Sequence, residues 1–213
     1  MARLQRPEQK SSNPATKFLE WKSNDKSFSY YDKDKGEKVK VELPLKFMFL
    51  EHYHNVRGWN DASQSGIYSN EVYAISTEEV NVKSFKGGPI VSGLYKDIKD
   101  TIVKSGGRYH RSLYVVLEDG TLANIQLKGS GVASYSEFYK ENSHLFDTKW
   151  IEINSAKEGK KGSIVFSSPE FVLGDAISKA SDKIAMDRAA ELQVYMNDYM
   201  SKPEILESEE LGI

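Results

Sequence analysis

The chain has 213 residues, of which 39% are hydrophobic and 28% charged, a composition typical of folded domains rather than disordered ones. It contains no cysteine, which excludes a disulfide framework and a thiolate zinc site. No stretch approaches 18 consecutive apolar residues, and the first residues lack the apolar core of a signal peptide, so we expect neither a membrane span nor secretion. These features favour a cytoplasmic protein built on one large domain.

The charges are unevenly distributed along the chain. The formal net charge is -2, yet residues 204–213 contain four glutamates and no basic residue. The remaining 29 basic and 27 acidic side chains leave a small positive excess on the body. Between Val80 and Lys128, eight basic residues accompany four acidic ones. Such a belt is compatible with an ordinary solvated surface or with an anionic partner.

The first half of the chain predicts strands. Residues 1–15 are polar and contain two prolines, which indicates a flexible N-terminal arm. In "SFSYYDKDKGEKVKVEL", alternating apolar residues flank a turn-like stretch, which predicts a hairpin. The run "LKFMFLEHYHNVRGW" is apolar on both parities near its start, as in a central strand buried on both faces. Two further strands are expected in "IYSNEVYAI" and "VNVKSFKGGP".

The second half mixes helices and hairpins. The spacing in "IVSGLYKDIKDTIVKSGG" predicts a helix that stops at Gly106 and Gly107. The Asp119-Gly120 dipeptide joins two β-rich runs and predicts a tight hairpin. "SYSEFYKENSHLF" indicates a short helix, and "KWIEINSAKEGKKGSIVFSS" a hairpin with a basic tip. An amphipathic helix capped by Asp175 is expected next, followed by an acidic tail.

The predicted organisation is an arm at 1–15, a β-rich body at 16–172, a C-terminal helix at 173–201 and a flexible acidic tail at 202–213. Short strands interrupted by glycine, with a helix inserted between sheet pairs, are typical of a small barrel rather than an open parallel sheet. We therefore expect a β-rich α+β fold with an OB-fold-like barrel.

Catalytic motifs are not evident in the sequence. No nucleophile elbow, phosphate-binding loop or zinc-protease helix occurs. His52 and His54 are two apart in a predicted strand, so their rings share a face and can chelate a metal, but no third ligand sits at a recognisable spacing. Ordinary structural histidines are the simpler interpretation. We expect a protein that is not an enzyme and needs no cofactor or metal.

Aromatic residues are frequent beside basic ones. The chain has nine Phe, three Trp and twelve Tyr. Unpaired bases stack on aromatic rings while Lys and Arg contact phosphates, so this pairing is typical of single-strand binding, although aromatic residues in β-rich domains also fill cores. Trp59, in a polar loop, is the best stacking candidate. The predicted nucleic-acid-binding residues are Trp59, Arg57, Lys83, Phe85, Lys86, Arg108, Tyr109 and Arg111.

Strand alternation divides the last of these candidates between two faces. Arg108 and His110 would share one face of their strand, while Tyr109, Arg111 and Leu113 would share the other. The second set becomes apolar toward its end, so its later members should face the core. Tyr109 and Arg111 would then lie at the outer end of the hairpin.

The C-terminal residues "EILESEELGI" combine acidic and apolar side chains. An acidic tail can occupy a cationic groove until nucleic acid displaces it. Its apolar end and terminal carboxylate can dock in a pocket on another protein. The predicted partner-binding residues are Glu207, Glu209, Glu210, Leu211 and Ile213.

A basic, aromatic, β-rich body followed by "EILESEELGI" resembles the single-stranded DNA-binding proteins of bacteria and tailed phages, and phage-encoded members in particular. The resemblance implies an OB-fold body that binds single-stranded DNA without catalysis. It also implies a role in DNA replication or recombination in the host cytoplasm, with partner proteins recruited by the tail.

Two other classes remain open from the sequence. A phage structural or assembly protein would place the aromatic residues in cores and interfaces and use the long helix to form a homo-oligomer. A metal-dependent nuclease would use His52, His54 and scattered acids.

Overall fold

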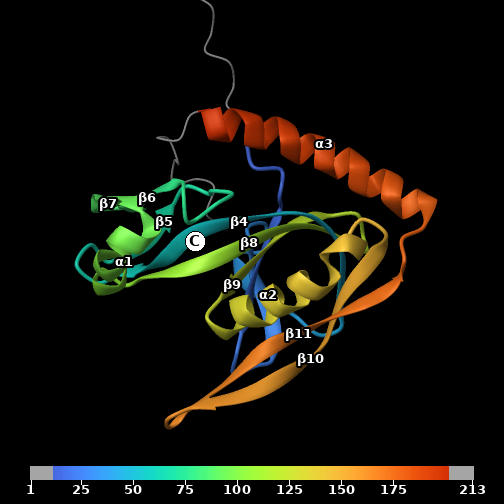
Figure 1. Cartoon of the computed structure of the whole chain (residues 1–213), viewed down its shortest axis with the longest axis horizontal. Coiled ribbons are helices and arrows are strands. Elements are labelled where there is room, and N and C mark those ends of the chain that lie inside the picture. Colours follow the sequence, from blue (N-terminus) through green and yellow to red (C-terminus); the bar gives the residue numbers. More distant parts are fainter. Residues whose placement is uncertain (1–11, 202–213) are drawn as a thin grey trace, which may run out of the picture.

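The computed structural model describes residues 12–201 (Figure 1). Its strands are β1 (Lys17–Lys22), β2 (Ser27–Asp32), β3 (Glu37–Val41), β4 (Leu45–Asn60), β5 (Ser65–Ser69), β6 (Glu79–Ser84), β7 (Gly88–Leu94), β8 (Gly107–Leu117), β9 (Leu122–Lys128), β10 (Lys149–Lys161) and β11 (Ile164–Ala176). Its helices are α1 (Tyr95–Lys104), α2 (Ser130–Asn142), the 3-10 turn η1 (Ser143–Leu145) and α3 (Lys179–Ser201). Within these residues, no helix has the length and apolar character that crossing a bilayer requires.

The strands form one open, mixed, 11-stranded sheet. Its main path runs β3-β2-β1-β9-β8-β4-β5-β6-β7, and β10 joins it by pairing with both β11 and the start of β4. The β1–β9 pair is parallel, while the other pairs between named strands are antiparallel. The predicted β-rich α+β class, with a helix at the C-terminal end of the described chain, is confirmed.

The central strand is β4. It pairs with β10 at its start, with β8 along most of its length and with β5 at its end. A register shift between Phe49 and Glu51 changes which side chains face which side. The run of apolar residues on both parities follows from this burial between two layers.

Three apolar clusters hold the layers together. The largest lies between the sheet and α2, which contributes Tyr135 and Phe138. A second forms on the opposite face of the sheet, where α3 packs through Leu192 and Met196. A third joins α1 to β4 and β5–β7. Figure 1 shows α3 crossing one side of the sheet and α1 grouped with β5–β7 at one end. Burial of each large apolar side chain contributes about 1.5–3 kcal/mol to stability.

The predicted hairpins are confirmed. The β2–β3 turn contains Gly36 and the β8–β9 turn contains Gly120, with φ values of 67° and 78°. Glycine adopts this left-handed conformation without the steric cost that other residues incur. The third hairpin pairs β10 with β11 as far as the basic tip at Lys160 and Lys161.

Two predicted helix starts are wrong. Residues 90–94 belong to β7, because they pair with β6 from Val82↔Val91 to Glu79↔Leu94, and α1 begins only at Tyr95. Likewise, β11 extends through Asp175 to Ala176. The last helix therefore starts at Lys179. Ser178 rather than Asp175 caps it, through its Oγ, which accepts a hydrogen bond from the Ser181 amide at 3.1 Å.

The described end of the predicted N-terminal arm is packed against the body. Ala15 is buried, the Asn13 amide donates a hydrogen bond to the Tyr114 hydroxyl at 3.2 Å, and the Thr16 amide donates one to the Leu122 carbonyl at 3.0 Å. Residues 1–11 and the predicted tail at 202–213 lie outside the described residues.

Candidate nucleic-acid interface

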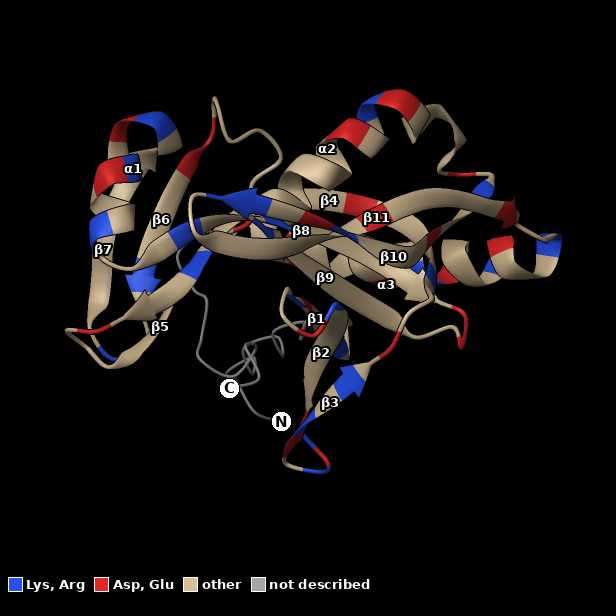
Figure 2. Ribbon diagram, turned by 90° about the horizontal axis from the view of Figure 1, so that it is seen from below, with Lys and Arg blue, Asp and Glu red and all other residues tan. Residues whose placement is uncertain are grey.

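A groove with a volume of about 640 Å³ crosses the face of the sheet opposite α2. Strands β1–β3 form one wall, and the end of β4 with β5 and the segment after β6 forms the other. Residues of β1, β8 and β9 form the floor between them. Figure 2 shows the lobe of β5–β7 and α1 standing apart from β1–β3, with β8 and β9 spanning the space between them.

Basic side chains outnumber acidic ones in the described lining. Six Lys or Arg residues accompany one acidic residue, and they come from both walls and the floor: Lys22, Lys33, Lys38, Arg57, Arg108 and Lys128. A concave surface lined by one sign of charge concentrates its electric field and attracts ions of the opposite sign. The groove is therefore suited to a polyanion.

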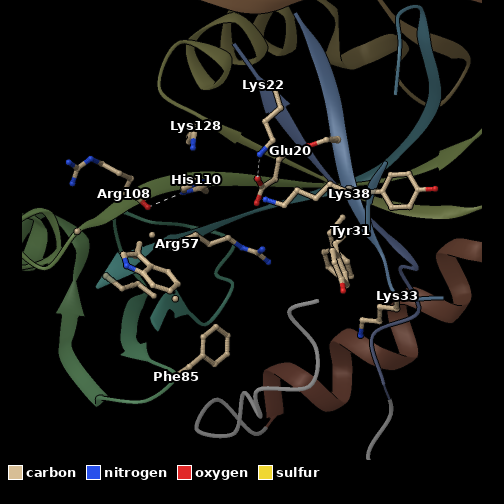
Figure 3. A pocket seen from close by; sticks show the side chains of 18 of the residues that line it. Glu20, Lys22, Tyr31, Lys33, Lys38, Arg57, Phe85, Arg108, His110 and Lys128 are labelled. Atoms are coloured by element: carbon tan, nitrogen blue, oxygen red, sulfur yellow. Dashed lines mark hydrogen bonds and ion pairs between the residues drawn. The ribbon is translucent and has the colours of Figure 1, made fainter. Parts of the chain in front are cut away.

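The one acidic residue in the described lining, Glu20, holds a lysine in place. Its carboxylate accepts a hydrogen bond from Lys22 Nζ at 2.7 Å (Figure 3). Burial opposes ionisation of Glu20, but the hydrogen bond and charge of Lys22, with Lys128 and Arg57 nearby, bring its pKa below the ordinary value. Glu20 is therefore ionised at neutral pH and holds the Lys22 ammonium at the groove.

Arg57 extends into the middle of the groove (Figure 3). Burial lowers the pKa of its guanidinium, while the Glu71 carboxylate raises it, and arginine remains charged in proteins. Burial also acts on Glu71, whose pKa it raises. The hydrogen bonds that its carboxylate accepts from the Tyr114 hydroxyl at 3.0 Å and from Asn55 Nδ2 at 3.3 Å oppose this increase. Arg57 is thus a half-buried cation whose charge is favoured by the nearby buried Glu71.

Aromatic rings lie on both walls. Trp59 is 49% exposed and Tyr31 37% exposed, unusually open for such large rings. Phe85 stacks on Tyr68, with ring centroids 4.6 Å apart and planes inclined by 28°. Figure 3 shows Phe85 and Tyr31 on opposite sides of the groove, with Arg57 between them. Flat rings beside cations provide stacking surfaces for bases near contacts for phosphates.

Glycines allow the backbone at Trp59 to approach a neighbouring turn closely. A Cβ at Gly58 would collide with the Gly106 carbonyl and lie 2.8 Å from Gly107 Cα. A Cβ at Gly106, whose φ is +95°, would collide with the Trp59 carbonyl. The exposed position of Trp59 therefore depends on this contact between backbones.

The structure brings together four of the eight predicted body residues. Arg57, Trp59, Phe85 and Arg108 line the groove. Arg108 Nη1 also donates hydrogen bonds to the carbonyls of Gly107 at 2.7 Å and Val103 at 3.3 Å. Figure 3 shows its guanidinium turned away from Arg57.

The other four predicted residues lie elsewhere. Lys83 sits on β6, opposite Tyr68, and Lys86 is exposed in the turn after β6. Neither is among the lining residues. Tyr109 and Arg111 lie on the other face of β8, because alternate side chains of a strand point to opposite faces. One groove cannot contact both pairs of β8 residues, as the alternation already indicated.

Sequence reasoning missed most of the β1–β3 wall and much of the floor. The missed residues include Phe18, Glu20, Lys22, Tyr30, Tyr31, Lys33, Lys38, His110 and Lys128. One signal was available, since the β2–β3 register places Tyr31 directly opposite Lys38, an aromatic residue beside a cation.

His52 and His54 lie on the opposite face of the sheet from the groove. Their Nδ1 atoms form hydrogen bonds with the hydroxyls of Tyr135 and Tyr109, respectively. Burial, followed by the charge of Arg111, lowers the pKa of each histidine to about 4. In residues 12–201, no cluster of three or more His, Cys, Asp or Glu residues could hold a metal ion.

Comparison of the chain with protein-family models, with curated proteins and with solved structures finds no match. The function of the groove is therefore inferred from its own chemistry.

Proposed function

We propose that the protein binds single-stranded DNA in the groove, with little sequence preference and without catalysis. The observation that carries the proposal is the groove itself, in which exposed aromatic rings on two walls flank a floor rich in lysine and arginine. Lysine and arginine contact the phosphates and release the counterions bound to them. Each base that stacks on an aromatic ring contributes about 1–3 kcal/mol to the binding free energy.

An unpaired strand suits this lining better than a duplex. Bases in a duplex stack on one another, and their faces are inaccessible to Trp59, Phe85 and Tyr31. Stacking does not depend strongly on base identity, because every base has an aromatic face. The protein therefore tolerates many sequences.

The strand order supports an OB-like barrel within the larger sheet. Strand β4 pairs with β8 and β10, β8 with β9, and β10 with β11, with α2 between β9 and β10. In the proposed barrel, β8 and β9 are the second and third of five strands, which carry the oligonucleotide-binding face of an OB-fold. Those strands contribute Arg108 and Lys128 to the groove.

Strand β1 lies where the third and fifth strands of such a barrel would approach each other. It pairs in parallel with β9, and Trp21 Nε1 donates a hydrogen bond to the Ser167 carbonyl of β11 at 3.0 Å. In this proposal, β1 is an inserted strand that widens the barrel and carries Glu20 and Lys22 into the groove.

The tail completes the proposal, although it lies outside the described residues. Its four glutamates compete with DNA for the basic groove, and the displaced tail recruits replication or recombination proteins in the cytoplasm. This arrangement follows the resemblance to bacterial and phage single-stranded DNA-binding proteins.

Fluorescence anisotropy tests the proposal directly. Labelled oligothymidine and a duplex of matched length are titrated with the full chain at low and moderate salt. We expect tighter binding to the single strand and a fall in affinity as salt rises. Absence of binding to oligothymidine at low salt would refute the proposal and favour the assembly class, for which sedimentation would be the next measurement.

A further inference from the structure

A cluster of aromatic and basic side chains lies on the face of β8 opposite the groove. Arg111 of β8 is directly across from His54 of β4, and its guanidinium lies over the Tyr135 ring of α2, 5.8 Å from the ring centre. Tyr109 packs against Tyr95 of α1, with ring centroids 5.7 Å apart. His52 packs on Tyr139, with ring centroids 4.8 Å apart. These side chains are called the Arg111 cluster below: Tyr95, Tyr109, Arg111, His52, His54, Tyr135 and Tyr139.

The hydrogen bonds of the Arg111 cluster determine where its protons are. Arg111 Nη2 lies 3.4 Å from His54 Nε2, and arginine can only donate, so Nε2 accepts and carries no proton. The proton of neutral His54 is then on Nδ1, which donates to the Tyr109 hydroxyl oxygen. The hydroxyl proton of Tyr109 remains available for another acceptor.

Arg111 makes no direct ion pair within the described chain, although the Glu51 carboxylate is close enough to act on Tyr135, over which Arg111 lies. No described carboxylate lies within ion-pair distance of it, and its Nε is enclosed without a hydrogen-bond partner. Both neighbouring histidines are neutral at physiological pH, since their pKa values are about 4. A half-buried cation without a direct ion pair is unfavourable, and a bound anion would relieve that cost.

We propose that the Arg111 cluster is a second phosphate-binding site, which takes the phosphate group of a nucleotide. The Arg111 guanidinium and the Tyr109 hydroxyl donate hydrogen bonds to the phosphate oxygens, since a guanidinium fork matches the geometry of a phosphate. The partly exposed rings of Tyr109 and Tyr139 are available to pack against the attached base. The phosphate belongs either to a free nucleotide or to a DNA strand that continues past the groove.

The four histidines of the chain provide separate reporters for a test by NMR. His52 and His54 report on the Arg111 cluster, His110 lies in the groove floor, and His144 is exposed in η1. Ring resonances of the full chain are followed while inorganic phosphate, thymidine monophosphate or oligothymidine is added at constant ionic strength. Inorganic phosphate is carried to about 10 mM, which exceeds a millimolar Kd tenfold.

Saturable shifts of His52 and His54, with His144 unmoved, are the expected result for both phosphate and the mononucleotide. The shifts should disappear in Arg111→Gln, weaken in Tyr109→Phe and persist partly in Arg111→Lys, which keeps the charge but loses the fork. Circular dichroism establishes that each variant is folded. Unmoved His52 and His54 resonances in the unmodified protein, or equal shifts in folded Arg111→Gln, would overturn the proposal.

The titration with oligothymidine distinguishes a free nucleotide from a DNA strand as the source of the phosphate. If the strand continues past the groove, Arg57→Gln should weaken the shifts that oligothymidine causes at His54 and leave the mononucleotide shifts intact. Equal His54 shifts caused by oligothymidine in the unmodified protein and in Arg57→Gln would show that the site binds phosphate independently of the groove. Phosphate binding at the Arg111 cluster does not depend on DNA binding in the groove. The NMR titration tests the first and the anisotropy titration tests the second, so either can fail without the other.

Discussion

Arg57 on β4 and Arg108 on β8 are direct cross-strand partners, and both line the groove. Like charges placed opposite each other destabilise a sheet. The fold limits the repulsion by binding Arg108 to two backbone carbonyls and by placing the buried Glu71 near Arg57. An anionic ligand bound in the groove, as proposed above, would further reduce this repulsion.

Replacement of Arg57 should reduce both DNA affinity and its salt dependence. In Arg57→Gln we expect affinity to fall by about tenfold to a hundredfold, because a charge-assisted contact is lost. The slope of log K against log salt is negative, and its magnitude should decrease by about 0.7, the value for one phosphate contact on a single strand. Arg57→Lys should recover the slope. Lys183→Gln, at an exposed site on α3 outside the lining, serves as the control, and an equal loss in that variant would contradict a specific role for Arg57.

Removal of the Trp59 ring should weaken binding without unfolding the protein. Trp59→Ala loses a stacking surface, so we expect a decrease in binding free energy of about 1–3 kcal/mol. The ring is half exposed, and its loss should therefore change the free energy of unfolding only slightly. Tyr73 has the same exposed fraction, 49%, but does not line the groove, which makes Tyr73→Ala a matched control. Anisotropy and urea unfolding measure the two effects, and undiminished binding by Trp59→Ala would exclude stacking on this ring.

An alanine at Gly106 should damage both stability and binding. The new Cβ would collide with the Trp59 carbonyl. In addition, the φ of Gly106 is +95°, a conformation that residues with a side chain rarely adopt. Strain of this kind costs about 1–3 kcal/mol, and relief of the collision would displace Trp59. Gly162→Ala is the control, because Gly162 has a φ of +62° but a Cβ added there would extend into open space, with no neighbouring atom within 4 Å. Equal losses of stability in the two variants would show that the close approach to Trp59 is unimportant.

Stability should fall as the pH is lowered from about 6.5 toward 4. Burial depresses the pKa of His110 to about 4, and His52 and His54 are lowered to similar values. The unfolded chain therefore binds protons in this range that the folded protein does not, which favours unfolding. His110 is only 8% exposed and contributes a slope of up to about 1.4 kcal/mol per pH unit. Urea unfolding across this range should show a shallower decline in His110→Gln, and an unchanged decline would assign the effect to other groups.

Removal of residues 204–213 should tighten binding to oligothymidine. In the proposed function, the four glutamates of this segment compete with phosphates for the basic groove, so the effect should shrink as salt screens both interactions. Anisotropy of the full chain and of a chain ending at Pro203 makes the comparison. Replacement of the same four glutamates by glutamine separates charge from length. Equal or weaker binding by the shortened chain would contradict a competing tail.

Local sequence patterns were sufficient for the hairpins and for the division of β8 into two faces. Asp119-Gly120 predicts its turn because the dipeptide tolerates positive φ, and the alternation from Arg108 to Leu113 follows from the two-residue period of a strand. The spacing of residues 90–94 is helical and by itself predicts a helix. Pairing with β6, which the spacing does not reveal, makes them a strand.

The groove was decided by tertiary structure. Its β1–β3 wall exists because β1 pairs in parallel with β9, from Lys17↔Ala123 to Glu20↔Gln126, two segments far apart in the sequence. No local pattern specifies such a pairing, which depends on burial of Leu19 and Ile125 in one common core. The sequence by itself determined which side chains carry charge and aromatic rings, and which neighbours in a strand share a face. Only the folded sheet determined which of these side chains meet across the groove, because contacts between distant strands form only when the whole core is buried at once.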